Sequence, residues 1–260
     1  MEYEYIIVCL AALIGSGLTF FSGFGLGTIL VPVFALFFPL EVALVLTAIV
    51  HFLNGGFKLL LVGIHANKNV ILRFGIPAII FSFLGANLLK VLSDNSFPMF
   101  YYRIQGHLFK IYPLGFIIGL LLILFALFEL IPRLNKLQLS QKYLPLGGIL
   151  SGFFGGLSGN QGALRSVFLL RAGLSKESFI ATGVVIACMI DITRLTVYIP
   201  KVLRHRDELD FTLIACATIA AFIGAYVGNR LLKKVTIVVL RYVVSIALML
   251  FGCLLMLGIL

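Results

Sequence analysis

Four polar residues recur at helical spacing inside one apolar stretch of the chain. Thr47, His51, Asn54 and Lys58 are four, three and four positions apart, and the positions between them are apolar or glycine. In an α-helix this spacing puts all four in one narrow stripe. Polar and ionisable groups are costly against lipid, so we expect the stripe to face a polar interior that can bind a ligand.

A second stripe follows in the other half of the chain. Asp191, Arg194 and Tyr198 have the same spacing as the last three residues of the first stripe. We expect the two stripes to border one shared polar interior. An acid three residues before a base also fits an intrahelical ion pair that only holds a helix bundle together. Both interpretations stay open at this point.

Structural roles are alternatives for the first stripe as well. Lys58 is close enough to His65, near the end of its apolar run, to reach the membrane surface with its ammonium group. His51 could relay a proton, because a free imidazole titrates near neutral pH, or could be a hydrogen-bonded core histidine. Thr47 and Thr182 could each satisfy only a backbone carbonyl one turn back.

The elements that carry these stripes are predicted to be membrane helices. Hydrophobic residues make up 61% of the 260 positions and charged residues only 12%, which excludes an ordinary soluble domain. Runs of about 20 apolar residues can cross about 30 Å of hydrocarbon. Six such runs are present: Ala43–Ile64, Ile71–Leu92, Pro113–Ile131, Ser178–Ile199, Phe211–Leu232 and Val235–Leu260. We therefore expect one compact, multi-pass domain in a bacterial inner (plasma) membrane.

The two halves of the sequence resemble each other. A shift of about 135 residues brings Gly17 onto Gly152 and Gly27 onto Gly162. This indicates a first repeat over residues 1–131, a linker over 132–143 and a second repeat over 144–260. Internal repeats are common in transporters, and their binding sites lie where the repeats meet near the midplane.

Each half opens with a segment that does not fit one helix. Residues Tyr5–Phe38 would form a helix of about 50 Å, longer than a bilayer needs. We expect breaks at the glycine-rich segments Ser22–Gly27 and Gly155–Gly162, because unwound backbone at membrane depth survives only where it lines protein or a watery cavity. The predicted fold is an all-α membrane protein with two inverted repeats. Each repeat is a glycine-broken re-entrant helix hairpin followed by three transmembrane helices.

The distribution of charge agrees with this topology. The net charge is +10, and in a membrane protein it is explained by the positive-inside rule rather than by nucleic acid. With three crossings in each half, ten basic residues fall on one side and six on the other. The ten are Lys68, Arg73, Arg133, Lys136, Lys142, Arg171, Lys176, Arg230, Lys233 and Lys234; the six are Lys90, Arg103, Lys110, Lys201, Arg204 and Arg206. The bias places both termini outside the cytoplasm.

The glycine breaks also predict a cradle for an anion. Broken helices expose backbone N–H groups and the positive end of the helix dipole, both of which favour negative charge. Arg165, one turn into the second arm, could supply a fixed cation, or could be the interfacial end of that arm, as Arg171 could. The candidate cradle residues are Gly25, Gly27, Thr28, Ser158, Asn160 and Gln161.

Several motifs resemble those of a known family. The segment "SGFGLGTILVP" at Ser22–Pro32 is followed by "LTA" at Leu46–Ala48, and the second glycine-rich segment is followed by "ATG" at Ala181–Gly183. Together with the repeat layout, these motifs resemble the TauE/SafE group of the 4-toluene sulfonate uptake permease family over essentially the whole chain. The resemblance implies transport of sulfite, thiosulfate, sulfoacetate or a related sulfonate, driven by an ion gradient. The second string departs from the family pattern at "GNQGALRS", which leaves the exact substrate undetermined.

These observations predict a secondary transporter for a small anion, working by alternating access with Na+ or H+ as coupling ion and without a cofactor. An anion channel is the first alternative. An intramembrane enzyme is a weaker one, because no HExxH, GxSxG or paired-Asp motif is present. The cysteines are too widely spaced for a metal or redox motif. The expected partners are the anion, the lipid bilayer and, for so small a bundle, a second copy of the chain.

Overall fold

A computed structural model describes residues 2–20, 25–95, 97–131, 133, 138–204, 210–231 and 237–260. Helices make up most of it, as predicted. They are α1 (Glu2–Thr19), α2 (Leu26–Ala35), α3 (Leu40–Val62), α4 (Lys68–Val70), α5 (Ile76–Asp94), α6 (Pro113–Leu130), α8 (Leu144–Ser158), α9 (Gly162–Leu169), α10 (Lys176–Arg204), α11 (Phe211–Leu231) and α12 (Ile237–Met256). Short helical turns lie at Gly63–His65 and Gln141–Tyr143, and a π-helical turn at Ile71–Gly75 leads into α5.

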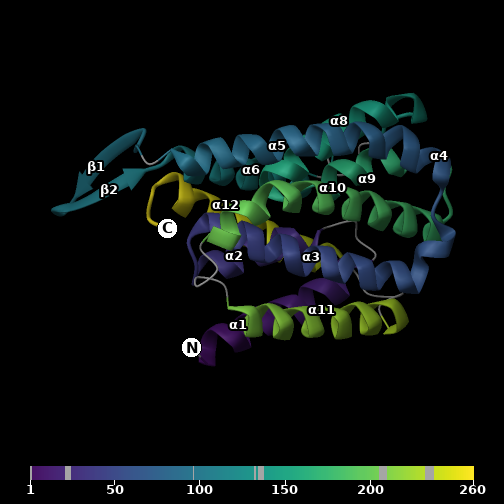
Figure 1. The fold of residues 1–260 in the computed structure, drawn as a ribbon, viewed down its shortest axis with the longest axis horizontal. Helices are drawn as coiled ribbons and strands as arrows, with labels where there is room; N and C mark the ends of the chain where they lie inside the picture. Colours follow the sequence, from purple (N-terminus) through teal and green to yellow (C-terminus); the bar gives the residue numbers. More distant parts are fainter. Residues whose placement is uncertain are drawn as a thin grey trace.

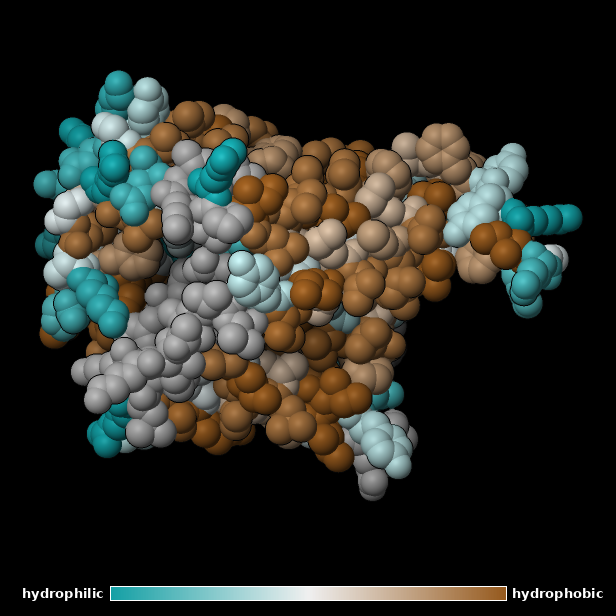
Figure 2. All heavy atoms as spheres, turned by 180° about the vertical axis from the view of Figure 1, so that it is seen from behind, coloured by the Kyte–Doolittle hydropathy of each residue, from teal (hydrophilic) through white to brown (hydrophobic). Residues whose placement is uncertain are grey.

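The long helices run roughly parallel (Figure 1). Within the described residues, five segments are long and apolar enough to cross a membrane: Leu40–His65, Lys68–Asp94, Pro113–Leu130, Lys176–Pro200 and Phe211–Arg230. The sixth predicted run contains α12, whose stretch Tyr242–Met256 is apolar but shorter. Apolar side chains cover the middle of the face in Figure 2, and hydrophilic ones gather toward its two ends. This is the surface of a multi-pass membrane protein.

Each half begins with a pair of helices, and the second helix of each pair, α2 or α9, is too short to cross a bilayer. The first pair, α1 and α2, are separate helices that pack together; residues 21–24, on which part of the predicted break falls, lie outside the described residues. The second pair, α8 and α9, are separated by Gly159, Asn160 and Gln161. This break is narrower than predicted, because Gly155 to Ser158 still belong to α8. At 8 and 10 residues, α9 and α2 are about 12 and 15 Å long.

Glycines bring α8 and α5 into backbone contact. A Cβ placed on Gly152 or Gly156 would lie 2.3 Å from the carbonyl oxygen of Ala78 or 2.1 Å from that of Ser82. These distances are too short for any side chain, so the two helices can pack this closely only with glycine at both positions. Gly85 faces α8 in the same way, since a Cβ on it would lie 2.1 Å from the carbonyl oxygen of Phe153.

The same type of contact joins α1 to α11. A Cβ on Gly224 would lie 2.1 Å from the carbonyl oxygen of Leu13, and one on Gly228 would lie 2.5 Å from that of Gly17. The first arm of each broken pair therefore packs against a long helix from the other half of the chain. The helices α6 and α12 pair with each other through Gly119 and Gly252.

One element was not predicted. Within the presumed loop between α5 and α6, strands β1 (Phe100–Ile104) and β2 (His107–Ile111) form an antiparallel hairpin. Gln105 and Gly106 make the turn, with φ values of 50° and 87°. Figure 1 shows the hairpin projecting from the end of the molecule that also holds both termini, opposite to α4. Apart from this hairpin, the described secondary structure is helical.

Candidate functional site

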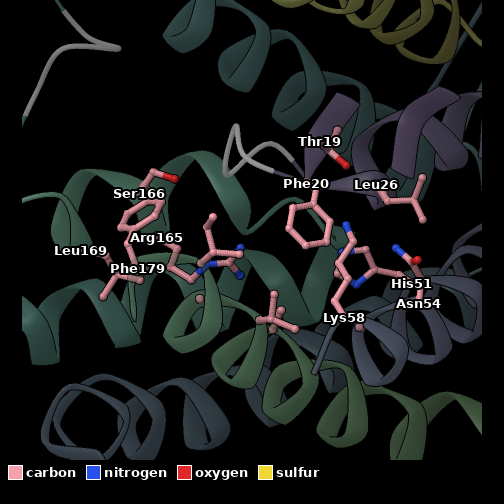
Figure 3. Close-up of a pocket in the computed structure, with 16 residues that line it drawn as sticks. Thr19, Phe20, Leu26, His51, Asn54, Lys58, Arg165, Ser166, Leu169 and Phe179 are labelled. Atoms are coloured by element: carbon pink, nitrogen blue, oxygen red, sulfur yellow. The ribbon is translucent and has the colours of Figure 1, made fainter. Parts of the chain in front are cut away.

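A small cavity lies beside the first helix break, between α3, α9 and the first turns of α10. Its volume is about 60 Å3, more than the roughly 15 Å3 that one water molecule needs. Five predicted site residues line it, one at the start of α2, three on α3 and one on α9, and the hydroxyl side chains of Thr19 and Ser166 add to its polar lining (Figure 3). The five are Gly25, His51, Asn54, Lys58 and Arg165.

The α3 stripe faces this cavity with three of its four residues. Lys58 is only 8% exposed, and its Nζ lies 5.4 Å from the centre of the Phe20 ring. Its ammonium group therefore does not reach the membrane surface, which contradicts the alternative given above for Lys58. Asn54 is buried, and its Oδ1 accepts a hydrogen bond of 3.0 Å from Ser16 Oγ. Because the amide oxygen accepts this bond, the orientation of the Asn54 amide is set and its nitrogen remains a hydrogen-bond donor.

Arg165 supplies a second cation from the opposite wall. It is 9% exposed, and its Nη1 donates to the side-chain oxygen of Gln161 at 3.2 Å. Figure 3 shows Arg165 reaching from α9 toward the space that Lys58 borders on the other side. Arg171, by contrast, is exposed, and its Nε donates to Gln138 Oε1 at 3.1 Å. The interfacial role fits Arg171 and does not fit Arg165.

A buried ionic chain connects the two stripes. His51 Nδ1 lies 2.5 Å from Asp191 Oδ2, while Asp191 Oδ1 lies 3.0 Å from Arg194 Nε and 2.9 Å from its Nη2. Asp191 and Arg194 are fully buried. The intrahelical pair considered as an alternative therefore exists, but it also holds a histidine that lines the cavity. Tyr198 lies outside this chain of contacts, because its hydroxyl donates to the carbonyl of Gly156 on α8.

The two helix breaks meet next to this chain. A Cβ on Gly27 would lie 3.4 Å from the carbonyl oxygen of Gly159. Gly159 has φ +78°, and a Cβ there would lie 2.5 Å from Nη1 of Arg194. Only glycine both adopts this positive φ readily and leaves room for the Arg194 guanidinium. On the other side, His51 Nε2 lies 3.8 Å from the position that a Cβ on Gly25 would take. His51 and Arg194 thus flank the point where the breaks meet.

Several polar atoms at this meeting point are buried and lack a hydrogen-bond partner among the described residues. They are Thr47 Oγ1, both side-chain polar atoms of Asn160, Gln161 Nε2 and Arg194 Nη1. Neither α2 nor α9 has a side-chain cap at its N-terminus, so the first backbone N–H groups of both arms are not satisfied in that way. Thr28 and Asn160 also line a smaller void of about 10 Å3. The region can therefore receive further polar groups.

Two further polar side chains lie beside the breaks. The Ser158 hydroxyl donates to the Phe154 carbonyl at 3.0 Å and accepts from the Asn160 N–H at 3.4 Å, so it holds the break itself. Glu129 is only 7% exposed and lines the smaller void. Ser16 and Phe20 were not predicted, since small polar and aromatic residues on an apolar helix give no distinctive signal.

Comparison with known proteins adds an independent line of support. The sequence model of the sulfite exporter TauE/SafE family matches residues 7–255, nearly the whole chain. No curated protein and no solved structure matches the chain. The family match agrees with the multi-pass architecture and with a cavity lined by two buried cations. The chain belongs to the sulfite exporter TauE/SafE family and is a membrane transporter.

Proposed function

We propose that this protein carries a small sulfur oxyanion, either sulfite or a short organosulfonate such as sulfoacetate, across the bacterial inner membrane by ion-coupled alternating access. The observation that carries the proposal is the cavity with Lys58 and Arg165 on opposite walls. None of the described residues that line it is acidic. Two buried cations in a lining that holds no carboxylate favour an anion, because burial is costly for positive charges that are not fully compensated. The charge of the buried Asp191 also acts on Arg165, but its carboxylate is already paired with His51 and Arg194.

The donors around the cavity bear on the substrate class. The three oxygens of a sulfite or sulfonate group need several donors, and Lys58 and Asn54 on α3 and Arg165 on α9 provide ammonium, amide and guanidinium groups. The cavity therefore suits an oxyanion group.

Alternating access is supported by the pattern of helix contacts. In the proposed repeats α1 corresponds to α8, and α5 corresponds to α11. The contact of α1 with α11 is therefore the equivalent of the contact of α8 with α5, and both contacts are made through glycine. This supports two inverted repeats with re-entrant hairpins, divided at residues 132–143. Transporters built in this way bind substrate near the midplane, where broken helices meet. Assembly with a second copy of the chain stays a prediction.

The position of the cavity supports loading from the cytoplasm. Its lining includes Lys58, near the C-terminal end of α3, and Phe179 and Ile180 in the first turns of α10. These helix ends lie on the α4 side of the breaks, where Lys68 and Arg73 are exposed. By the positive-inside rule this side is cytoplasmic. A site that is loaded from the cytoplasm suits an exporter.

Flux in proteoliposomes tests the proposal. Purified protein should move sulfite with saturable kinetics, taurine and acetate should compete weakly, and a pH or sodium gradient should change the rate. Unitary currents without saturation would favour an anion channel instead. Turnover of a lipid-linked substrate would favour an enzyme, and the absence of flux with every sulfur oxyanion tested would contradict the proposed substrate class.

A further inference from the structure

We propose that His51 takes up a proton together with the anion, so that the protein couples anion movement to proton movement. This inference rests on the proposed transport function and identifies the coupling ion. His51 joins the cavity on one side to the buried Asp191–Arg194 pair on the other. Its side chain is 12% exposed, which leaves it a path to the cavity, whereas Asp191 and Arg194 are fully buried.

The hydrogen bond to Asp191 determines what the cavity side of the imidazole can do. Nδ1 lies 2.5 Å from Asp191 Oδ2, so in the neutral ring Nδ1 carries the hydrogen and donates it. The other nitrogen, Nε2, then has a lone pair, which repels an anion. A protonated ring presents an N–H at Nε2 and becomes a donor. One proton therefore converts His51 from a group that opposes an anion into one that binds it.

The surrounding charges make this proton depend on the anion. The cations Lys58 and Arg165 share the cavity, and Arg194 lies beyond Asp191. These three cations oppose a further positive charge on His51, and the carboxylate of Asp191 favours it. Two further titratable groups lie near the cavity: Glu129, which lines the smaller void with Gly25, and Cys188, whose Sγ lies 2.8 Å from where a Cβ on Gly55 would be. A bound anion supplies the missing negative charge and favours the protonated ring.

Asp191 is less suited to carry the proton. Its two carboxylate oxygens already accept from His51 and from Arg194, so protonating it would break an ion pair with a buried guanidinium. It acts instead as a positioning residue that fixes the ring orientation. By linkage, a proton that strengthens anion binding must itself bind more tightly when the anion is present, by the same factor.

Binding of thiosulfate to the purified full chain tests this inference, because thiosulfate stays a dianion across the relevant pH range. We expect its affinity to rise by up to about tenfold per pH unit, the limit for uptake of one proton per anion, as the pH falls through the neutral range. Titration calorimetry in two buffers of different ionisation enthalpy should also show uptake of up to one proton per anion. In His51→Gln, which keeps a donor toward Asp191, both effects should disappear.

His65→Gln is the matched control, because His65 is exposed at the end of the same helical segment. It should keep the pH dependence and the proton uptake of the wild type. Saturable binding without pH dependence or proton uptake in the wild type would overturn the role of His51 and leave the transport proposal standing. No saturable binding of thiosulfate or sulfite at any pH would overturn both. Proton uptake that persists in His51→Gln would assign the proton to another group.

Discussion

Helices α3 and α10 carry polar residues at the same spacing but use them differently. On α3, His51, Asn54 and Lys58 line a cavity. On α10, the matching residues are occupied by protein: Asp191 with His51 and Arg194, and Tyr198 with the Gly156 carbonyl. The two helices therefore share a spacing but differ in chemistry. The α3 stripe lines the cavity proposed to bind the anion, and the α10 stripe holds the histidine of that cavity.

The difference separates binding from stability. Substitutions of the cavity-lining residues of the α3 stripe should act mainly on anion binding, because these groups face a cavity. Substitutions in the α10 stripe should act mainly on stability, because its groups are buried and paired within the protein. The predictions below test this separation, beginning with the largest expected effect.

Removal of Asp191 should be the most damaging change. In Asp191→Ala the guanidinium of Arg194 stays fully buried without its ion-pair partner, which costs about 3–5 kcal/mol of folding free energy. Thermal unfolding in detergent measures the loss. Glu177→Ala, an exposed acid at the start of the same helix, should change the midpoint little. Equal midpoints for the two variants would mean that α10 does not depend on this pair.

The close contact that Gly156 makes between α8 and α5 should be the next most sensitive feature. Gly156→Ala would place a Cβ 2.1 Å from the Ser82 carbonyl oxygen, so α8 and α5 must separate, at a cost of about 1–3 kcal/mol or failed assembly. The control Gly56→Ala adds a Cβ with no atom within 4 Å, on α3. It should be neutral or slightly stabilising. Expression level and unfolding midpoint report both, and equal loss in both variants would contradict this account of the contact.

The sequence predicted the helical framework because its signals are local. Long apolar runs and the glycine-rich interruption at Gly159 can be recognised without knowing which residues pack against them. The structure has two separate helices, α8 and α9, on either side of this interruption. The spacing of His51, Asn54 and Lys58 also fixed their shared face. What spacing could not reveal was which residues lie across from that face. The bond from Ser16 to Asn54 joins residues 38 positions apart, and the bond from His51 to Asp191 joins residues 140 apart.

The hairpin was missed for a different reason. Its strands, "FYYRI" and "HLFKI", are short and mostly exposed, so they lack the apolar alternation that marks a half-buried strand. Its turn, Gln105-Gly106, is also not one of the strongest hairpin dipeptides.

Lys58 and Tyr198 test the comparison directly, since they occupy equivalent positions of the two stripes. Lys58→Gln removes a charged donor from the cavity and should weaken sulfite binding about 10- to 100-fold. Tyr198→Phe should leave the affinity nearly unchanged and cost about 1 kcal/mol of stability through the lost bond to Gly156. The dissociation constant and the unfolding midpoint should be measured for both. A reversed pattern would exchange the roles of the two helices.

The smallest effect is expected at Ser16. Its hydroxyl orients the Asn54 amide, so Ser16→Ala should weaken sulfite binding by about 2- to 10-fold without removing a cavity charge. Thr196→Ala serves as the control, since that hydroxyl is exposed and bonds only to the Thr193 carbonyl on its own helix. Unchanged affinity in Ser16→Ala would show that the orientation of Asn54 does not matter for the anion.

Equilibrium binding of sulfite to the Arg165→Gln and Arg171→Gln variants tests the central claim most directly. Both changes remove one positive charge from α9 or its end, but only Arg165 is buried in the cavity wall. The account predicts that Arg165→Gln weakens binding by at least about tenfold, as expected for the loss of a charge-assisted donor, while Arg171→Gln binds as the wild type does. Equal affinity in Arg165→Gln and the wild type would contradict it.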